Sequence, residues 1–142
     1  MNRKMTRENP LVCLVDTRVD GHHPMYAAVY AEVFRSLGCD VWLTAPAPLI
    51  AAMPRSVDPD TDACSLTLHP WQPPGPPVEG PIRSERLAAC RWQALGSILD
   101  ESSRTAGRYP DLVVPLWFDD FIAEILPRRA VESSIRCPFA GL

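Results

Sequence analysis

The first regular feature of the chain is an uninterrupted apolar run at residues 11–15, Leu-Val-Cys-Leu-Val, which ends at Asp16. Such a run, with β-branched members, predicts a strand that is buried on both faces, as in a parallel sheet. After a polar loop, Pro24 stands where a helix tolerates proline, in its first turn. Apolar residues then recur at intervals of four (Met25, Val29, Val33, Leu37), with a second row beside them (Tyr26, Tyr30, Phe34). The pattern predicts a helix that is apolar over a wide arc and largely covered by the rest of the protein.

Gly38 is a natural stop for this helix, and residues 41–44, Val-Trp-Leu-Thr, follow it as a second short strand. Strand, helix and strand make a βαβ unit, which is right-handed by the usual rule. Further along, residues 49–53 suit a short helix, and the alternation at residues 64–69 suits a strand.

A longer amphipathic helix is predicted from Ser84, a plausible N-cap, to the region of residues 104–107. Residues 112–117 read as another strand, in which Pro115 favours an edge position or a bulge. Residues 121–126 suit a short helix stopped at Pro127, and residues 135–139 are a last apolar run. The alternation predicts an α/β fold with an open, mostly parallel sheet and helices on both faces.

Proline is the one compositional outlier, with 16 among 142 residues, about twice the usual share. Ten of them fall between Pro46 and Pro81, so residues 54–83 are expected to be irregular, with 70–77 an extended surface loop. We therefore expect a flexible N-terminus at residues 1–9 and a single Rossmann-like α/β domain at residues 10–142, incomplete at its C-terminal end.

Charge and cysteine content exclude several classes of protein. A net charge of -3 gives no bulk attraction to nucleic acid or anionic lipid. No run approaches the roughly 18 apolar residues of a membrane span, and the charged N-terminus lacks the apolar core of a secretory signal, so we expect a cytoplasmic protein. The five cysteines are widely spaced and form no C-x-x-C pair, which argues against a disulfide framework or a zinc site.

Two loops are expected at the carboxyl edge of the sheet, where open α/β sheets bind ligands: residues 16–23 and residues 117–120. The first contains Asp16, Arg18, Asp20, Gly21, His22 and His23, and the second contains Trp117, Phe118, Asp119 and Asp120. Three readings of the first loop stay open: a tight turn at Gly21 with no further role, an anion site at the helix N-terminus, and a His-Asp acid–base pair.

Other chemistry is less well supported. Gly21 stands alone, so the G-x-G-x-x-G fingerprint is absent, and no phosphate-binding P-loop is present. Adjacent histidines usually point apart, which argues against metal binding by His22 and His23 with Asp16 and Asp20. A small hydrolase that uses Asp and His is disfavoured, because the sequence contains no recognisable nucleophile. Trp71 and Trp92 are expected to pack in the core, and no role is assigned to His69.

The segment VDTRVDGHHPMYAAVYAEVFRSLGCDVWLTAP resembles the start of glycosyltransferases of the GT-B fold. The later segments PDLVVPLWFDD and IRCPFAGL resemble subsequent strands of the same half. The resemblance implies a Rossmann-like, acceptor-side domain that faces a nucleotide-sugar domain across a cleft. It implies no cofactor beyond the nucleotide-sugar donor substrate, and a small-molecule, glycan or lipid acceptor.

By position, the resemblance places His22 and Asp119 as catalytic residues at the cleft. It places the substrate-binding residues at Asp20, Gly21, His23, Trp117 and Asp120.

The chain also departs from this family, because it stops at Leu142 without the donor-binding domain. The glutamate pair of retaining members has a chance counterpart in Glu124 and Glu132, which we reject because Pro127 interrupts it and it lies in the wrong half. The chain is therefore expected to be inactive alone and to need a missing C-terminal domain or a second chain. The alternative is a non-enzymatic, flavodoxin-like binding or interaction module, which would not need Gly21 and His22.

Overall fold

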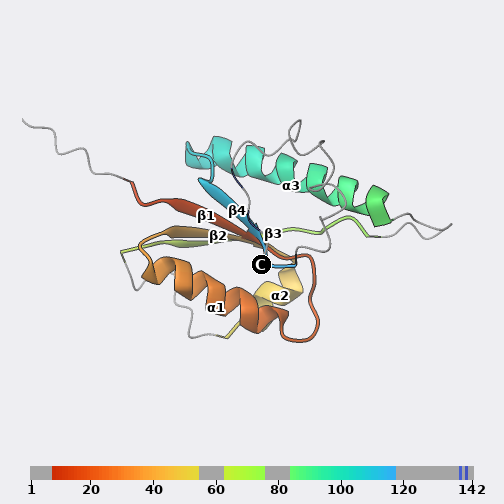
Figure 1. Cartoon of the computed structure of the whole chain (residues 1–142), viewed down its shortest axis with the longest axis horizontal. Coiled ribbons are helices and arrows are strands. Elements are labelled where there is room, and N and C mark those ends of the chain that lie inside the picture. Colours follow the sequence, from red (N-terminus) through yellow and green to blue (C-terminus); the bar gives the residue numbers. More distant parts are fainter. Residues whose placement is uncertain (1–7, 55–62, 76–83, 118–137, 139, 141–142) are drawn as a thin grey trace, which may run out of the picture.

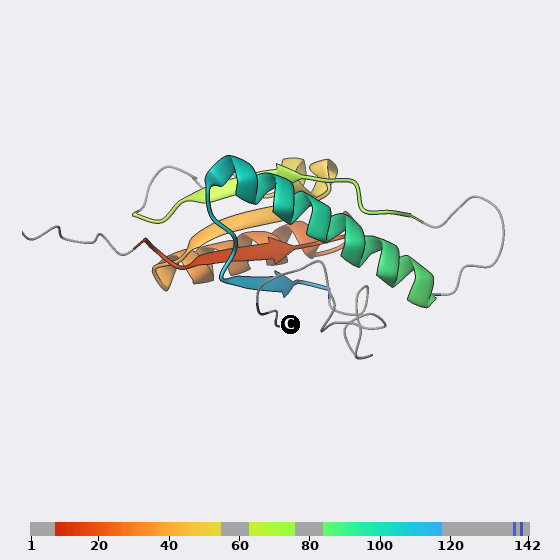
Figure 2. The same cartoon turned by 90° about the horizontal axis from the view of Figure 1, so that it is seen from above.

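Four parallel strands form the centre of the molecule, in the order β3-β2-β1-β4. The computed structural model describes residues 8–54, 63–75, 84–117, 138 and 140. In chain order the elements are β1 (Leu11–Val15), α1 (His23–Ser36), β2 (Asp40–Ala45), α2 (Ala47–Ala52), β3 (Leu66–Pro70), α3 (Ser84–Ala106) and β4 (Leu112–Pro115). Helices α1 and α2 cover one face of the sheet, and α3 crosses the other (Figures 1 and 2). The α/β architecture expected from the sequence is confirmed.

Strand β1 is buried on both faces, which explains its unbroken apolar run. Leu11, Cys13 and Val15 pack on the α3 side with Trp92, Leu95 and Leu99 of that helix. The alternate residues Val12 and Leu14 pack on the other side with Ala27 and Ala31 of α1. Because successive side chains of a strand point to opposite faces, one short strand contributes to two cores.

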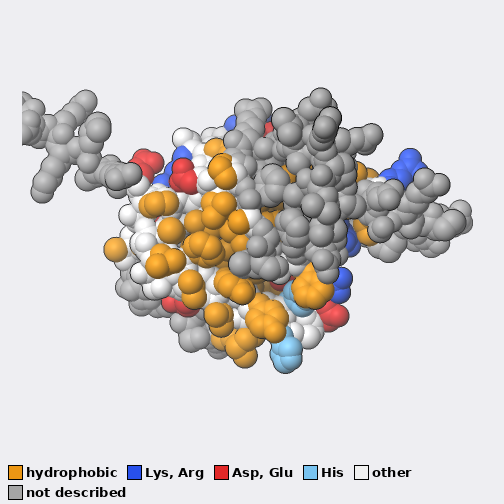
Figure 3. All heavy atoms as spheres, viewed as in Figure 1, with side chains coloured by type: hydrophobic (Ala, Val, Ile, Leu, Met, Phe, Trp, Pro, Cys, Tyr) orange, Lys and Arg blue, Asp and Glu red, His pale blue; other side chains and the backbone are white. Residues whose placement is uncertain are grey.

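Helix α1 packs on the sheet through small residues, and its large apolar row faces outward. Ala27, Ala28 and Ala31 are buried, so the helix backbone comes close to β1 and β2. The row of Met25, Tyr26, Val29, Val33 and Leu37 is between 44% and 71% exposed. The expectation that this helix would be largely covered is therefore wrong for the residues described. Figure 3 shows the resulting concentration of hydrophobic side chains over α1.

The sheet continues beyond β4. The Val113 N–H donates to the Pro138 carbonyl at 2.9 Å, and the Ala140 N–H donates to the Val113 carbonyl at 3.0 Å, which is the pattern of parallel pairing. Pro115 is the last residue of β4, so its missing N–H costs no bond within the strand. β4 is the last of the four described strands, but its bonds to residues 138 and 140 mean that it is not a free edge. The helix predicted at residues 121–126 lies outside the described residues.

The proline-rich region is described in part. Residues 71–75 form no helix or strand, as predicted, but Trp71 is only 6% exposed and belongs to the core. The Trp71 N–H donates to the Ala45 carbonyl at 3.0 Å and so extends the pairing of β2 and β3 past Pro70. Among the helices described, none is both long and apolar enough to cross a bilayer.

Candidate functional site

The loop that follows β1 brings Asp16 and His23 into direct contact. His23 Nδ1 lies 2.9 Å from Asp16 Oδ2 and 3.1 Å from Asp16 Oδ1. Asp16 is fully buried, and His23 is 9% exposed. A buried carboxylate held against an imidazole is the arrangement that the sequence left open as a His-Asp acid–base pair.

The local backbone explains how residues seven positions apart meet. The Asp16 N–H donates to the Thr44 carbonyl at 3.0 Å and so prolongs the ladder of β1 and β2 by one residue. Gly21 has a φ of 62°, a left-handed conformation that turns the loop back and that favours glycine. The His23 N–H then donates to the Asp20 carbonyl at 3.4 Å, and α1 begins at His23. A side chain at position 21 would meet no atom within 4 Å, so glycine is needed for its conformation and not for space.

The hydrogen bond to Asp16 assigns the two nitrogens of His23 different roles. An ionised carboxylate only accepts hydrogen bonds, so Nδ1 carries the proton in the neutral ring. Nε2 then keeps its lone pair, and none of the described residues forms a hydrogen bond with it. A neutral imidazole in this tautomer is a proton acceptor at Nε2, and the adjacent carboxylate would stabilise the cation formed on proton uptake.

Trp117, just beyond β4, forms a wall of the site. Its ring lies edge-on to His23, with ring centroids 5.4 Å apart, and the Arg18 guanidinium lies 4.8 Å from its centroid. The backbone N–H of Arg18 donates to Asp16 Oδ1 at 3.0 Å. Among the described residues, Trp117 Nε1 is buried without a hydrogen-bond partner. The two loops expected at the carboxyl edge do meet, at this point.

The structure brings together some of the residues predicted from the sequence and separates others. His23 and Trp117 join Asp16, whereas His22 is exposed, makes no capping bond and has its ring 6.1 Å from that of Tyr26. Asp20 and Gly21 are exposed members of the turn. Asp119 and Asp120 lie outside the described residues. Sequence reasoning named Asp16 within the loop but not among the site residues, although its place directly after a buried strand is a recognisable signal.

Metal ligation has no support in the described part of the chain. No group of three or more His, Cys, Asp or Glu residues there is placed to hold a metal ion.

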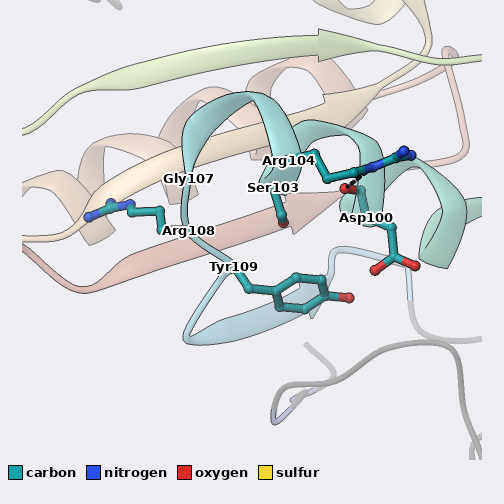
Figure 4. Close-up of a pocket in the computed structure, with 6 residues that line it drawn as sticks. All are labelled: Asp100, Ser103, Arg104, Gly107, Arg108 and Tyr109. Atoms are coloured by element: carbon teal, nitrogen blue, oxygen red, sulfur yellow. Dashed lines mark hydrogen bonds between the residues drawn. The ribbon is translucent and has the colours of Figure 1, made fainter.

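Two cavities lined by described residues lie away from this site, both beside α3. One, of about 470 Å³, lies where α3 meets the turn toward β4, and Figure 4 shows Arg108 pointing away from the other five lining residues. Arg108 is bound instead to Asp40, at 2.9 Å. Neither this cavity nor the next includes Asp16 or His23.

The second cavity, of about 480 Å³, lies between β3 and the C-terminal half of α3. The His69 ring packs on Trp42 at 4.9 Å, and its Nδ1 lies 3.2 Å from Ser102 Oγ. Burial lowers the pKa of His69, so the ring is held neutral. His69 therefore contributes to the packing of β3 on α3, a role that the sequence did not suggest.

Comparisons with known proteins identify no family. No family profile and no curated protein matches the chain. A UDP-glucosyltransferase from Polygonum tinctorium capable of glucosylating indoxyl, solved in complex with 3,4-dichloroaniline, is 16% identical at a TM-score of 0.44 over 96% of this chain and 30% of its own. The glycosyltransferase SsfS6 of Streptomyces sp. SF2575 is 16% identical at a TM-score of 0.38, over 94% of this chain and 39% of its own. The chain spans 30% and 39% of the lengths of these two proteins, and likeness at this level leaves its activity to be argued from its own residues.

Proposed function

We propose that this chain is the acceptor-side domain of a glycosyltransferase that uses a nucleotide-sugar donor, with His23 as the base that activates the acceptor hydroxyl. The observation that carries the proposal is the buried Asp16 carboxylate in contact with His23 Nδ1, at 2.9 Å, at the carboxyl edge of a parallel sheet. The resemblance of the segment around this loop to the start of GT-B glycosyltransferases supports the same reaction class.

The proposed step is a proton transfer coupled to glycosyl transfer. As the acceptor oxygen bonds to the anomeric carbon, its proton passes to His23 Nε2 and the bond from that carbon to the nucleotide diphosphate breaks. Asp16 stabilises the imidazolium that forms, and it fixes the reactive tautomer beforehand. Trp117 would line the acceptor side. The group that binds the leaving diphosphate is assigned to a further domain or a second chain, so this half alone would be inactive.

The assignment changes the roles expected from the sequence. His23, expected there to bind substrate, becomes the base in place of His22, and its partner is the carboxylate of Asp16, whereas the resemblance placed a catalytic carboxylate at Asp119. His22 lacks a carboxylate partner among the described residues, which is why the geometry favours its neighbour.

The test is a comparison of two adjacent histidines in the native gene product, assayed with a panel of nucleotide sugars and hydroxyl acceptors. His23→Gln should lower kcat by about 10²- to 10⁴-fold, the usual contribution of a general base. The matched variant His22→Gln should change kcat little. A His23→Gln protein that folds and transfers sugar at the wild-type rate would refute the role of His23.

The exposed apolar row of α1 favours one alternative, a non-enzymatic interaction module. In that case binding of a protein partner would depend on Val29 and Val33, which are 50% and 44% exposed, and would be indifferent to His23. The variants Val29→Ser and His23→Gln thus separate the two functions.

A further inference from the structure

The described part of the proline-rich segment after β3, residues 71–75, is bound to the rest of the molecule by hydrogen bonds at Trp71 and at Pro74. The Trp71 N–H bonds to the Ala45 carbonyl at 3.0 Å, and Arg91 Nε of α3 donates to the Pro74 carbonyl at 3.2 Å. The indole Nε1–H of the same Trp71 donates to the Asp16 carbonyl at 2.9 Å. A segment that the sequence presented as a surface loop therefore reaches the residue that holds His23.

Asp16 has a partner for each of its polar groups. Its N–H bonds to Thr44, its carbonyl accepts from Trp71, and its carboxylate accepts from the Arg18 N–H and contacts His23. Asp16 is also the point at which the ladder of β1 ends and the irregular loop begins. The indole of Trp71 thus bonds to the main chain at the position whose orientation determines where the carboxylate points.

We propose that Trp71 is a positioning residue for the Asp16–His23 pair, an inference that rests on the proposed function only in taking His23 as the base. The indole body is buried in the core on the α3 side of the sheet, where the cluster as a whole, and no single neighbour, holds its N–H in a fixed direction. Without that N–H the Asp16 carbonyl would be a buried acceptor with no partner, which costs enough for the loop to rearrange. Rearrangement of residue 16 would turn the carboxylate away from His23 Nδ1.

Proline suits this role. Pro70, Pro73 and Pro74 each fix their own φ, so the chain around Trp71 has little freedom to lose when the indole docks. In this proposal, these three prolines help to present one tryptophan rigidly to an aspartate 55 residues earlier in the chain.

The test reads the tautomer of His23 directly, with no donor or acceptor present. Nitrogen-15 shifts of the ring, measured by NMR at about pH 8, above the usual titration range of histidine, distinguish an Nδ1–H from an Nε2–H tautomer. Wild-type protein should show Nδ1–H. Trp71→Phe should show a mixture of both forms, whereas the control Trp92→Phe, an equally buried tryptophan in the same cluster, should match the wild type. A Trp71→Phe protein that keeps a single Nδ1–H tautomer would overturn the proposal.

A second variant covers the case in which Trp71→Phe does not fold. Site-specific replacement of Trp71 by its benzothienyl analogue, in which sulfur takes the place of the N–H, keeps the shape of the ring system. This replacement should give the same mixture of tautomers, and a wild-type tautomer here would count against positioning as firmly as in the phenylalanine variant.

The outcomes separate this inference from the proposed function. If Trp71→Phe changes the tautomer but His23→Gln does not slow sugar transfer by the native gene product, positioning stands and the transferase role of His23 fails. If His23→Gln abolishes transfer and Trp71→Phe leaves the tautomer unchanged, His23 is the base and Trp71 only fills the core. If the proposed function and the positioning role are both correct, Trp71→Phe should lower kcat with little change in the KM for the acceptor.

Discussion

At the scale of single residues, two adjacent histidines differ in surroundings because a helix begins between them. His22 precedes the first turn of α1 and is exposed, while His23 opens the helix and turns inward to a buried carboxylate. Neighbouring residues on a helix point about 100° apart, so adjacent identical side chains rarely share an environment. The same rule made a paired metal site at these histidines unlikely from the sequence.

Asp16→Asn tests the carboxylate itself. The amide has nearly the same shape, but it cannot stabilise an imidazolium and offers its own N–H to His23, which would favour the wrong tautomer. We expect kcat of the native gene product to fall by about 10²-fold or more while the fold is retained, since general-base catalysis contributes on this scale. Steady-state kinetics together with the far-ultraviolet circular dichroism of the variant check this. A full-rate Asp16→Asn enzyme would contradict the role given to the pair.

At the scale of secondary-structure elements, polar side chains near the start of β2 tie three segments together. Asp40 accepts from the Ser65 N–H at 2.7 Å, just before β3, and from Arg108 at 2.9 Å, just after α3. The contacts between the sheet and its helices are mainly apolar. Near β3, His69 adds a polar contact to α3, because its ring packs on Trp42 and its Nδ1 lies close to Ser102 Oγ. Each of these polar contacts makes the stability of the fold depend on pH in a definable direction.

Asp40 should contribute to stability in neutral solution and lose that contribution in acid. Burial opposes its ionisation, but hydrogen bonds from Ser65 and Asn9 and the charge of Arg108 outweigh burial and lower its pKa below 3.8. The folded state therefore holds the carboxylate charged where the unfolded chain begins to protonate, so stability is present above about pH 4 and lost as the pH falls further. Asp40→Asn should reduce the free energy of unfolding at neutral pH by about 1.5–3 kcal/mol.

Urea unfolding followed by tryptophan fluorescence at neutral and acid pH measures this difference. The difference in unfolding free energy between wild type and Asp40→Asn should become smaller below about pH 4. If the difference is the same at neutral and acid pH, the lost stability comes from packing and not from charge.

His69 should make the fold less stable as the solution becomes acid, over a higher range of pH. Because burial lowers its pKa below 6.5, the unfolded chain takes up the proton before the folded one does. The contribution of the neutral ring is therefore complete above about pH 6.5 and declines as the pH falls toward the lower folded-state value. His69→Gln, which can still bond to Ser102, should flatten the dependence of the unfolding free energy between about pH 7 and pH 5.

The exposed His22→Gln is the matched control for this measurement, since its side chain makes no hydrogen bond among the described residues. If the two glutamine variants give the same curve, the dependence on pH arises elsewhere in the chain.

At the scale of the whole molecule, the helices on the two faces of the sheet differ in the side chains that they turn outward. Helix α3 lies along one face, while α1 on the other face turns an apolar row to the surface (Figures 1 and 3). Half-exposed valine, methionine and tyrosine side chains in a row are more than the scattered apolar residues of an ordinary surface. This row would favour association of the isolated chain.

We expect the 142-residue chain to self-associate with increasing concentration, and we expect the double variant Val29→Ser and Val33→Ser to reduce that association. Both residues are about half exposed, so the substitutions should cost little stability. Sedimentation velocity over a range of concentrations measures the effect. The control is Ala27→Ser with Ala31→Ser on the buried side of the same helix, which should destabilise the fold without removing the surface row.

The sequence by itself determined the order of the elements and the class of the fold. The unbroken run of β1, the proline and glycine that bound α1, and the apolar stripe of α3 are local signals, and each element formed where its signal lay. The meeting of the loops after β1 and β4 at the carboxyl edge also followed, because parallel strands bring these loops to one end of the sheet.

Only the tertiary structure decided which side of α1 faces the sheet, which histidine meets Asp16, and that Trp71 reaches the same aspartate. Periodicity reveals that a helix has a wide apolar arc, but close approach to a sheet selects the small residues, Ala27 and Ala31, over the large ones. The contact of Trp71 with Asp16 spans 55 residues of chain and depends on the direction of one N–H in a packed core. Such contacts depend on the packing of the whole chain, because no local pattern of residues encodes the orientation of a side chain in a distant core.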